Sequence, residues 1–370
     1  MFNNFPFHRV NWKTSIFLIL TFIVAVVATP IYIYHYGLDW FQVGMFFFYT
    51  VATIMSITLG YHRLFSHLAF KAKWPVRLAT LLFGAAAFEN SCLSWASDHR
   101  HHHKHTDHDG DPYDISRGFF YAHIGWLLFK LDPMPLMNNV GDLRKDKMVM
   151  WQHKWVHLIG AVVGLVVPTL LGYWYKGAEG ALGAFLLAGI LRIVVVQHCT
   201  FFINSLCHTI GSRPYNSGNS ARDSAIMAFF TCGEGYHNYH HAFQHDYRNG
   251  VKPWQFDPTK WMIWFLSKLG LASNLRRVPQ EKILLAEMRE AQRLLEQQRM
   301  GVIKREESCP LRQRAEEALE GFSATLTNCC SQLEEAVANK VTLSKAAMVK
   351  IQSEIRQVSR KLGKFKPSFS

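Results

Sequence analysis

The sequence predicts an all-α integral membrane protein with four transmembrane helices in two hairpins and a histidine-rich cap on the cytosolic side. Two features predict this fold class: apolar runs that come in pairs, and an uneven distribution of lysine and arginine around them. A helix needs roughly 20 mostly apolar residues to cross the hydrocarbon core of a bilayer. Four stretches reach that length, at residues 15–34, 38–59, 157–175 and 181–203.

Lysine and arginine indicate which ends of these hairpins face the cytoplasm. The short connections inside the two hairpins carry a single lysine, Lys176. Because cytoplasmic loops are enriched in lysine and arginine, the basic outer ends place both termini in the cytoplasm. The formal net charge of +13 then follows from membrane topology, and no nucleic-acid-binding motif accompanies it. The outer ends carry Arg9, Lys13, Lys71, Lys73, Arg77, Arg144, Lys145, Lys147 and Lys154.

A fifth apolar stretch, residues 78–96, is interpreted as a segment on the cytosolic side or at the membrane interface. If it crossed the membrane, His62 would lie on the opposite side from His99. Glu89 and Asn90 would then also lie in hydrocarbon, where polar and ionisable groups are costly. We therefore expect this stretch to pack on the bundle without spanning.

The composition changes near residue 278, where long apolar runs give way to Lys, Arg, Glu and Gln. Residues 1–277 are predicted to form the membrane domain, and residues 278–370 a polar, helical C-terminal extension. Helical patterning extends over 283–300 and again over 311–362, with an interruption near Pro310. A solvated helical appendage is the default interpretation, and a partner-binding or self-associating helix is the alternative.

Nine histidines in four clusters indicate one binuclear metal site. Two clusters have the pattern HxxHH, which on a helix places three imidazoles on one face. The first and third clusters directly follow the second and fourth apolar stretches, so the same helices can carry them out of the membrane. The cysteines include no CxxC pair, which argues against a thiolate metal site. The nine are His62 and His67 in HRLFSH, His99, His102 and His103 in HRHHH, His208 in NSLCH, and His237, His240 and His241 in HNYHH.

The number of ligands points to two metal ions. Neutral imidazole suits iron, zinc, copper and nickel, so the ligand type alone does not select the metal. Nine histidines exceed what one ion can use, and a pair of iron ions is the choice that could activate O2. For the run HRHHHKH taken alone, the alternative is a solvated basic stretch or an adventitious metal binder.

The order and spacing of the clusters resemble the histidine boxes of the membrane fatty acid desaturases of the stearoyl-CoA (delta-9 acyl-CoA) type. The matching segments are HRLFSH, DHRHHHKHTDHDGDP, NSLCH and GEGYHNYHHAFQHDY, together with RGFFYAHIGWLL and DPTKW. The resemblance runs from residue 15 to residue 275 and implies a four-span bundle with a cytosolic cap, two Fe ions held by the nine histidines, and an acyl tunnel. Asn204 matches an asparagine that holds a metal through water in this family.

Other polar residues near the boxes are expected to play supporting roles. Glu234 stands three residues before His237, as in the ExxH pairs of soluble di-iron bundles, but one such pair without its partners is weak evidence. Candidate carboxylates for tuning the ligand histidines are Asp98, Asp107, Asp109, Asp111 and Glu234. The histidines not expected to bind metal are His101, His105 and His108, which are solvated or adjacent to the ligands, and His123, which is structural.

The reaction implied by the resemblance is the O2-dependent introduction of a cis double bond, at the delta-9 position, into a saturated acyl chain. The implied substrate is an acyl-CoA, with an acyl lipid (phospholipid) as the alternative. Ser97 stands where animal acyl-CoA members have an arginine near the thioester carrier, which weakens the acyl-CoA assignment. A related histidine-box hydroxylase is a further alternative. A non-enzymatic metal-binding or transport protein would instead place ionisable residues inside the spans.

Electrons for this reaction are expected to come from another protein. The sequence has no HPGG-type cytochrome b5 segment, no GxGxxG loop and no cysteine set for an iron–sulfur cluster. A ferredoxin, cytochrome b5 or a flavin reductase would serve as the external donor. The resemblance also places chain-length residues on the second span, with Phe46 and Thr50 as candidates and ordinary helix or lipid packing as the alternative.

Overall fold

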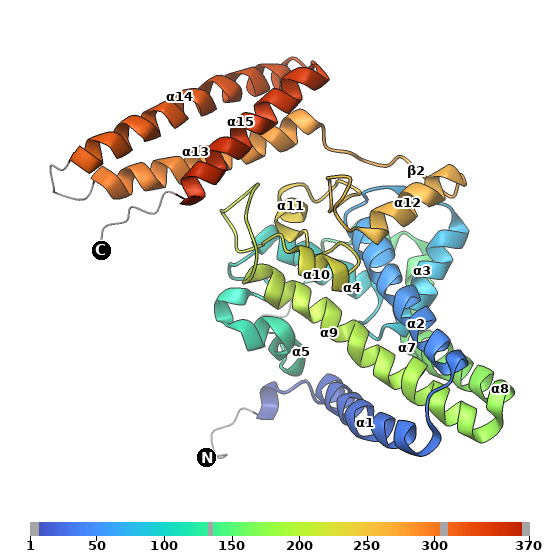
Figure 1. Cartoon of the computed structure of the whole chain (residues 1–370). Helices are drawn as coiled ribbons and strands as arrows, with labels where there is room; N and C mark the ends of the chain where they lie inside the picture. The colour runs from blue at the N-terminus through green and yellow to red at the C-terminus, as the bar shows by residue number, and fades with distance from the viewer. Residues whose placement is uncertain (1–6, 132–135, 304–309, 365–370) are drawn as a thin grey trace. The chain divides into compact units, whose positions relative to one another are not determined.

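The protein is mostly helical and divides into two compact units, as this computed structural model shows (Figure 1). The structure describes residues 7–131, 136–303 and 310–364. The membrane unit comprises Met1–Gly211 and Asn219–Arg277, and the C-terminal unit comprises Ser212–Gly218 and Val278–Ser370. The C-terminal unit thus includes a short piece of the loop that follows His208.

The first two apolar helices, α1 (Trp12–Tyr36) and α2 (Trp40–Met55), are joined by a short turn. Gly37 in this turn has a φ of 73°, in the left-handed region that favours glycine. The Asp39 carboxylate caps α2 by accepting from the backbone N–H of Gln42 at 2.9 Å. α2 continues directly into the π-helical segment η2 (Ser56–Ser66), every residue of which is buried. One continuous apolar helix therefore carries His62 into the protein interior.

The helical segment Lys147–His208 supplies the remaining long apolar helices. A straight helix of its 62 residues would be about 90 Å long, roughly three times the hydrocarbon thickness of a bilayer. Lys176 and Gly177 leave helical geometry, and the chain turns there. The limbs pack so closely that a Cβ on Gly172 would lie 2.3 Å from the Gly180 carbonyl oxygen. The elements are α7 (Lys147–Ala161), η5 (Val162–Val166), α8 (Val167–Ala184), η6 (Phe185–Leu191), α9 (Arg192–Ser205) and η7 (Leu206–His208).

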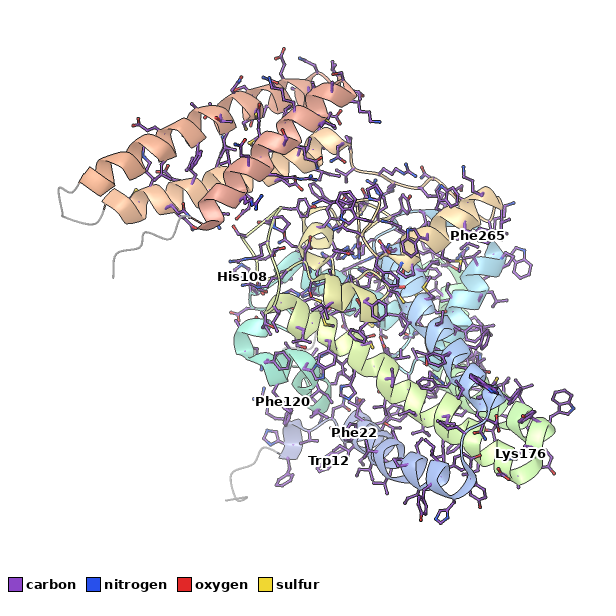
Figure 2. The ribbon with its side chains drawn as sticks, viewed as in Figure 1. Trp12, Phe22, His108, Phe120, Lys176 and Phe265 are labelled. Carbon is purple, nitrogen blue, oxygen red and sulfur yellow. The ribbon has the colours of Figure 1, made fainter. Side chains whose placement is uncertain are left out.

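The length and apolar character of these helices identify an integral membrane protein. Within the described ranges, three helices are long and apolar enough to cross a membrane: Trp12–Tyr36, Trp40–Ser66 and Lys147–His208. Large apolar side chains such as Trp12 and Phe22 remain exposed along α1 (Figure 2). Figure 2 also shows that the turn at Lys176 lies at the opposite end of the membrane unit from His108.

The predicted interfacial stretch 78–96 is divided between two helices, α3 (Trp74–Ala86) and α4 (Cys92–His105). Phe88 and Asn90 have positive φ angles of 57° and 74°, which end helical geometry between α3 and α4. The Ser91 hydroxyl then caps α4 by accepting from the backbone N–H of Ser94. With 13 residues, α3 is about 20 Å long, which is shorter than the hydrocarbon core.

Short elements complete the membrane unit. Strands β1 (Lys71–Ala72) and β2 (Ala272–Ser273) pair antiparallel, so the chain after η2 meets the chain that follows the last helix of the unit. The remaining elements are η1 (Phe7–Arg9), η3 (Ile115–Arg117), η4 (Tyr121–Gly125), α5 (Trp126–Leu128), α6 (Gly141–Arg144), α10 (Ala225–Phe230), α11 (His237–Ala242) and α12 (Pro258–Lys268).

A buried arginine connects three helices of the membrane unit. The guanidinium of Arg192, which is fully buried, donates to the carbonyl oxygens of Ala86, Gly164 and Ala188. Gly164 and Ala188 lie in π-helical segments, where the α-helical hydrogen-bond pattern is broken. Arg192 therefore satisfies backbone groups at the points where these helices depart from regular geometry.

The C-terminal unit is a bundle of three helices, α13 (Gln280–Ile303), α14 (Pro310–Ala338) and α15 (Lys345–Lys364) (Figure 1). The helical patterning over 311–362 therefore corresponds to two helices. The chain turns between them at Lys340, whose φ is 53°, and the Ser344 hydroxyl accepts from the backbone N–H of Ala347 at the start of α15. The bundle has its own core, which includes Leu284, Met288, Leu295, Leu326, Leu333, Ile351 and Ile355.

Candidate metal centre

Helical segments distant in sequence bring the predicted histidines together in the membrane unit. η2 carries His62, α4 carries three histidines, η7 ends at His208, and α11 carries three more. They form two groups, and within each group the ligand atoms lie within 4.8 Å of one another. The first group is His62, His67, His99, His103 and His240, and the second group is His102, His208, His237 and His241. All nine predicted histidines belong to one of these groups.

The Nε2 atoms of the first group point toward a common centre. The Nε2 atom of His240 lies 2.9 Å from that of His62 and 2.9 Å from that of His103. The Nε2 atoms of His67 and His99 lie 2.8 Å apart. A metal bound at about 2.1 Å to two nitrogens at right angles holds those nitrogens about 3.0 Å apart. The spacing of the first group therefore fits one metal ion.

The second group has the same arrangement. The Nε2 atom of His237 lies 3.1 Å from those of His208 and His241. The Nε2 atom of His102 lies 3.2 Å from that of His241. The donor set of both groups, imidazole nitrogens at metal-binding spacing, therefore fits two ions.

Carboxylates lie beside the opposite ring nitrogen of two ligands. Nδ1 of His102 lies 2.9 Å from both carboxylate oxygens of Asp111, and Nδ1 of His62 lies 2.8 Å from Oε2 of Glu234. A carboxylate in this position favours the tautomer with a proton on Nδ1. The Nε2 lone pair of each ring is then available to a metal.

Hydroxyl groups hold two further ligands. Nδ1 of His208 lies 2.6 Å from Oγ of Ser220, and the Ser220 hydroxyl donates to the carboxylate of Asp107. Nδ1 of His99 lies 3.3 Å from the hydroxyl of Tyr113. The Ser220 hydroxyl, itself held by Asp107, therefore orients the ring of His208, and the Tyr113 hydroxyl orients the ring of His99.

The candidate carboxylates differ in the role that their positions allow. Asp111 and Glu234 lie directly beside ligand rings, and Asp107 acts through Ser220, whereas Asp109 is exposed. Sequence reasoning did not identify Ser220 or Tyr113. Tyr113 follows Asp111 by two residues in the loop after α4, a proximity that could have suggested it.

A buried arginine holds Glu234 in place. The guanidinium of Arg63, 1% exposed, donates to Glu234 Oε1 at 2.8 Å, to Asp257 Oδ2 at 3.1 Å and to the Tyr247 carbonyl at 2.8 Å. Burial alone would raise the pKa of Glu234, but Arg63 and His62 outweigh it and lower that pKa to about 2. Glu234 is therefore ionised beside His62, an arrangement that sequence reasoning missed entirely.

Burial keeps most of the ligand histidines neutral. It lowers the pKa of these rings below the usual value because the charged imidazolium would lose its hydration, and neighbouring imidazoles lower that pKa further. Neutral imidazole is the form that binds metal. The residues with this lowered pKa include His67, His99, His103, His237, His240 and His241.

The four histidines that were not predicted to bind metal, His101, His105, His108 and His123, lie outside both groups. The Nε2 atom of His101 lies 2.9 Å from the Leu136 carbonyl oxygen, and its ring stacks on that of His105. His123 contacts the Ser205 hydroxyl at 3.0 Å and Nδ1 of His198 at 3.0 Å.

Alanine variants of His101 and His105 are expected to keep the bound-metal content and most of the activity of the parent. Their rings contact neither histidine group, so their loss leaves every candidate ligand in place. Elemental analysis and a turnover assay on the purified variants would check this. Loss of bound metal in either variant would show that the ligand set in α4 is misassigned.

One cavity reaches both histidine groups. It has a volume of about 830 Å³ and is lined by His62 and His99 of the first group and by His102 and His237 of the second. This volume lies within the usual range for small-molecule sites, roughly 300–1,000 Å³. Half-buried Asn204 also lines the cavity.

Two half-buried carboxyl groups, those of Glu89 and Asp98, form part of the cavity wall. Glu89 accepts from the Thr200 hydroxyl at 2.8 Å and from Nε1 of Trp95 at 3.3 Å. Burial raises the pKa of Glu89 to about 8, although both hydrogen bonds oppose the shift. Burial also raises the pKa of Asp98, which lines the same cavity, to about 7. Glu89 is therefore mostly protonated at neutral pH, whereas Asp98 is close to half ionised there.

Comparison with known proteins identifies the family. The family model of the fatty acid desaturases matches residues 38–264, which include all nine histidines of the two groups. The chain belongs to the fatty acid desaturase family. The family predicted from the histidine boxes is thus confirmed.

Individual relatives agree with this family. This chain is 44% identical over 246 residues to a "probable acyl-CoA desaturase" of Schizosaccharomyces pombe, covering 66% of this chain and 51% of that protein. It is 41% identical over 258 residues to "acyl-CoA desaturase 1" of Saccharomyces cerevisiae, covering 69% and 50%. It is 37% identical over 241 residues to "stearoyl-CoA desaturase 5" of Bos taurus, covering 64% and 72%. The chain therefore spans about half the length of the first two relatives.

Proposed function

We propose that this desaturase uses two iron ions and O2 to introduce a cis double bond, at the delta-9 position, into the saturated chain of an acyl-CoA. The observation that carries the proposal is the cavity of about 830 Å³ that reaches both histidine groups. Its wall includes apolar side chains that suit a methylene chain, among them Phe17, Leu18, Ile54, Ile57 and Val156.

Each histidine group would hold one iron, and Asn204 would hold one of them through a water. When bound, the two irons would supply the activation of O2 that removal of hydrogens from unactivated methylenes requires. Asp111 and Glu234 orient the rings of His102 and His62. Burial keeps most of the other ligand rings neutral. The apolar wall excludes water and positions the chain beside both groups.

We further propose four spans, with both termini and the metal centre on the cytosolic side. The turn at Lys176 divides Lys147–His208 into two limbs, each long enough to cross a bilayer, which supports a second hairpin. The short α3 supports an interfacial placement of that segment. The orientation rests on the basic outer ends of the hairpins.

Two exposed lysines that line the cavity support acyl-CoA as the carrier. Lys13 and Lys130 line the cavity and are exposed, and Nζ of Lys13 lies 3.2 Å from Nε2 of His157. Ammonium groups at this position suit the phosphates of a CoA headgroup. The printed names of the related acyl-CoA desaturases agree with this carrier.

Purified desaturase is expected to be inactive with NADPH and O2 alone, and to become active when a reduced carrier and its reductase are added. The reason is that the 370-residue sequence contains no haem, flavin or iron–sulfur motif. The assay would supply a saturated acyl chain either as acyl-CoA or within a phospholipid and would identify the product by mass spectrometry. Desaturation of the phospholipid alone would show that the substrate is an acyl lipid and not an acyl-CoA. A hydroxylated product would overturn the desaturase assignment.

Substitutions at Phe46 and Thr50 are expected to change the preferred chain length. Neither residue lines the cavity, which on this helix begins at Ile54, so their place at the closed end of the tunnel is a proposal. Thr50→Trp should favour shorter chains and Phe46→Ala longer ones, by roughly 1–3 kcal/mol. Product profiles from mixed acyl-CoA substrates would measure the shift. Profiles identical to the parent for both variants would show that other residues close the tunnel.

A further inference from the structure

The guanidinium of Arg100 joins two ligand-bearing elements of the membrane unit. Arg100 directly follows the candidate ligand His99 on α4. Its Nε atom donates to the Ser66 carbonyl at 3.0 Å, and its Nη2 atom donates to the Phe65 carbonyl at 2.9 Å. Phe65 and Ser66 are the last two residues before His67, the first-group ligand that caps the C-terminus of η2. Arg100 therefore ties α4 to η2 next to a ligand on each element.

These contacts satisfy backbone groups at the end of a helix. The last carbonyl groups of a helix have no N–H partner within that helix. Phe65 and Ser66 are 3% and 6% exposed, so water has little access to their carbonyl groups. A buried carbonyl without a partner is unfavourable. Arg100 therefore takes the place of the missing N–H donors at the end of η2.

A carboxylate orients the same guanidinium. Asp142 on α6 accepts from Nη1 and Nη2 of Arg100, at 2.7 Å and 2.9 Å. Nη1 also donates to the Asn139 carbonyl at 2.7 Å. A guanidinium has five N–H donors in a fixed planar arrangement, and each donor of Arg100 has an acceptor. The orientation of this side chain is therefore fully determined, and the point charge of a lysine could not reproduce it.

The ligands on either side of this contact belong to one candidate metal site. The Nε2 atoms of His67 and His99 lie 2.8 Å apart, and both residues belong to the first group. The histidines of η2 and its C-cap, His62 and His67, are ligands of the first group alone. A change in the position of the η2 terminus would therefore act on the first group.

We propose that Arg100 is a positioning residue for the first histidine group and that Asp142 orients its guanidinium. The pair holds the end of η2 against α4, so that Nε2 of His67 stays at metal-binding distance from Nε2 of His99. The inference rests on the metal-binding part of the proposed function. Loss of the contact is expected to weaken one of the two metal sites and to spare the other.

The test compares Arg100→Met with Arg144→Met, a matched change at an exposed arginine of α6 that donates to the Met137 carbonyl. Full-length proteins loaded with Fe(II) would be challenged with increasing chelator, and iron per chain would be measured. Residues that support metal ligands affect metal affinity roughly 10–100-fold. Because Arg100 contacts the backbone beside a ligand and not its ring, we expect Arg100→Met to release one of two irons at an about tenfold lower chelator concentration. Arg144→Met should match the parent.

Two ligand variants show which iron responds. His208→Ala removes a ligand of the second group, so the iron that remains is that of the first group, and adding Arg100→Met should weaken its retention to the same degree. His67→Ala removes a ligand of the first group, and adding Arg100→Met there should leave the remaining iron unchanged. Equal weakening of both irons by Arg100→Met would show a general loss of folding and would overturn the proposal.

Substitutions of Asp142 keep the test valid if Arg100→Met does not fold. The Asp142 side chain is 42% exposed, so its removal leaves no buried gap. Asp142→Ala should weaken the same iron by less than Arg100→Met, and Asp142→Asn, which keeps one acceptor oxygen, should retain it better than Asp142→Ala. Asp142→Ala should add nothing in an Arg100→Met background, because both act through the same contact. A parent-like chelator profile of Asp142→Ala, or of a folded Arg100→Met, would overturn the proposal.

The same measurements separate this inference from the proposed function. A parent protein that retains two irons, together with parent-like profiles of both the Arg100 and the Asp142 variants, would contradict the role of Arg100 and leave the metal centre intact. A parent protein that binds no iron would contradict the metal-binding part of the proposed function, and this inference with it.

Discussion

Replacing His240 by alanine is expected to lower desaturase activity by more than about a hundredfold, the upper end of the effect of losing a ligand's hydrogen-bond partner. Its Nε2 atom lies 2.9 Å from the Nε2 atoms of both His62 and His103, so it stands at the centre of the first group. The side chain is also 1% exposed, which leaves little access for a water to replace it. Turnover with a reduced electron donor and iron per chain would be measured together.

The matched control for His240→Ala is His101→Ala, which removes an imidazole outside both groups. We expect the control to retain two irons and the His240 variant to lose at least the iron of the first group. Parent-like turnover by His240→Ala would contradict the assignment of the first group as a metal site.

Replacing Arg63 by methionine is expected to destabilise the membrane unit by about 3–5 kcal/mol, the typical cost of breaking a buried ion pair. Methionine occupies much of the same volume but leaves Glu234 and Asp257 buried without their cation. The carboxylate beside His62 would then lose its anchor, so activity should fall as well. Thermal unfolding of detergent-solubilised protein should show a midpoint lowered by on the order of 10 °C.

Arg77→Met is the control for the buried arginine. Arg77 also pairs with a carboxylate, that of Asp146, but both side chains are about one quarter exposed, at 28% and 24%. Exposed ion pairs contribute about 0–1 kcal/mol, so this variant should unfold close to the parent temperature. Equal losses of stability in the two variants would show that the buried ion pairs of Arg63 contribute no more to stability than the partly exposed pair of Arg77.

The histidine groups could be predicted from the sequence because local spacing determines which side chains share a helical face. His99, His102 and His103 lie on α4, and His237 begins α11, as the HxxHH patterns indicate. The short distance from the second apolar stretch to His62 likewise indicated that one helix carries this ligand. Family resemblance supplied the reaction and the metal, which spacing alone left open.

Partners distant in sequence could not be predicted in the same way. Arg63 meets Glu234 and Asp257 across separations of 171 and 194 residues, and no local pattern relates them. Ser220 lies on an irregular loop, where side-chain directions follow no sequence period, so its contact with His208 could not be predicted from spacing. The division of 311–362 into two helices depends on a turn at Lys340, a residue that favours helix in isolation.

The most direct test of the central claim is lipid analysis after expression in a host that lacks its own desaturase. The account predicts that cells expressing the parent chain accumulate cis-monounsaturated acyl chains with the double bond at the delta-9 position, and that cells expressing His240→Ala do not. Electron supply by the host would be checked with a known desaturase. Saturated lipids alone in the parent strain, with the protein present in the membrane and the known desaturase active, would contradict the proposal that these two histidine groups and their shared cavity desaturate an acyl chain.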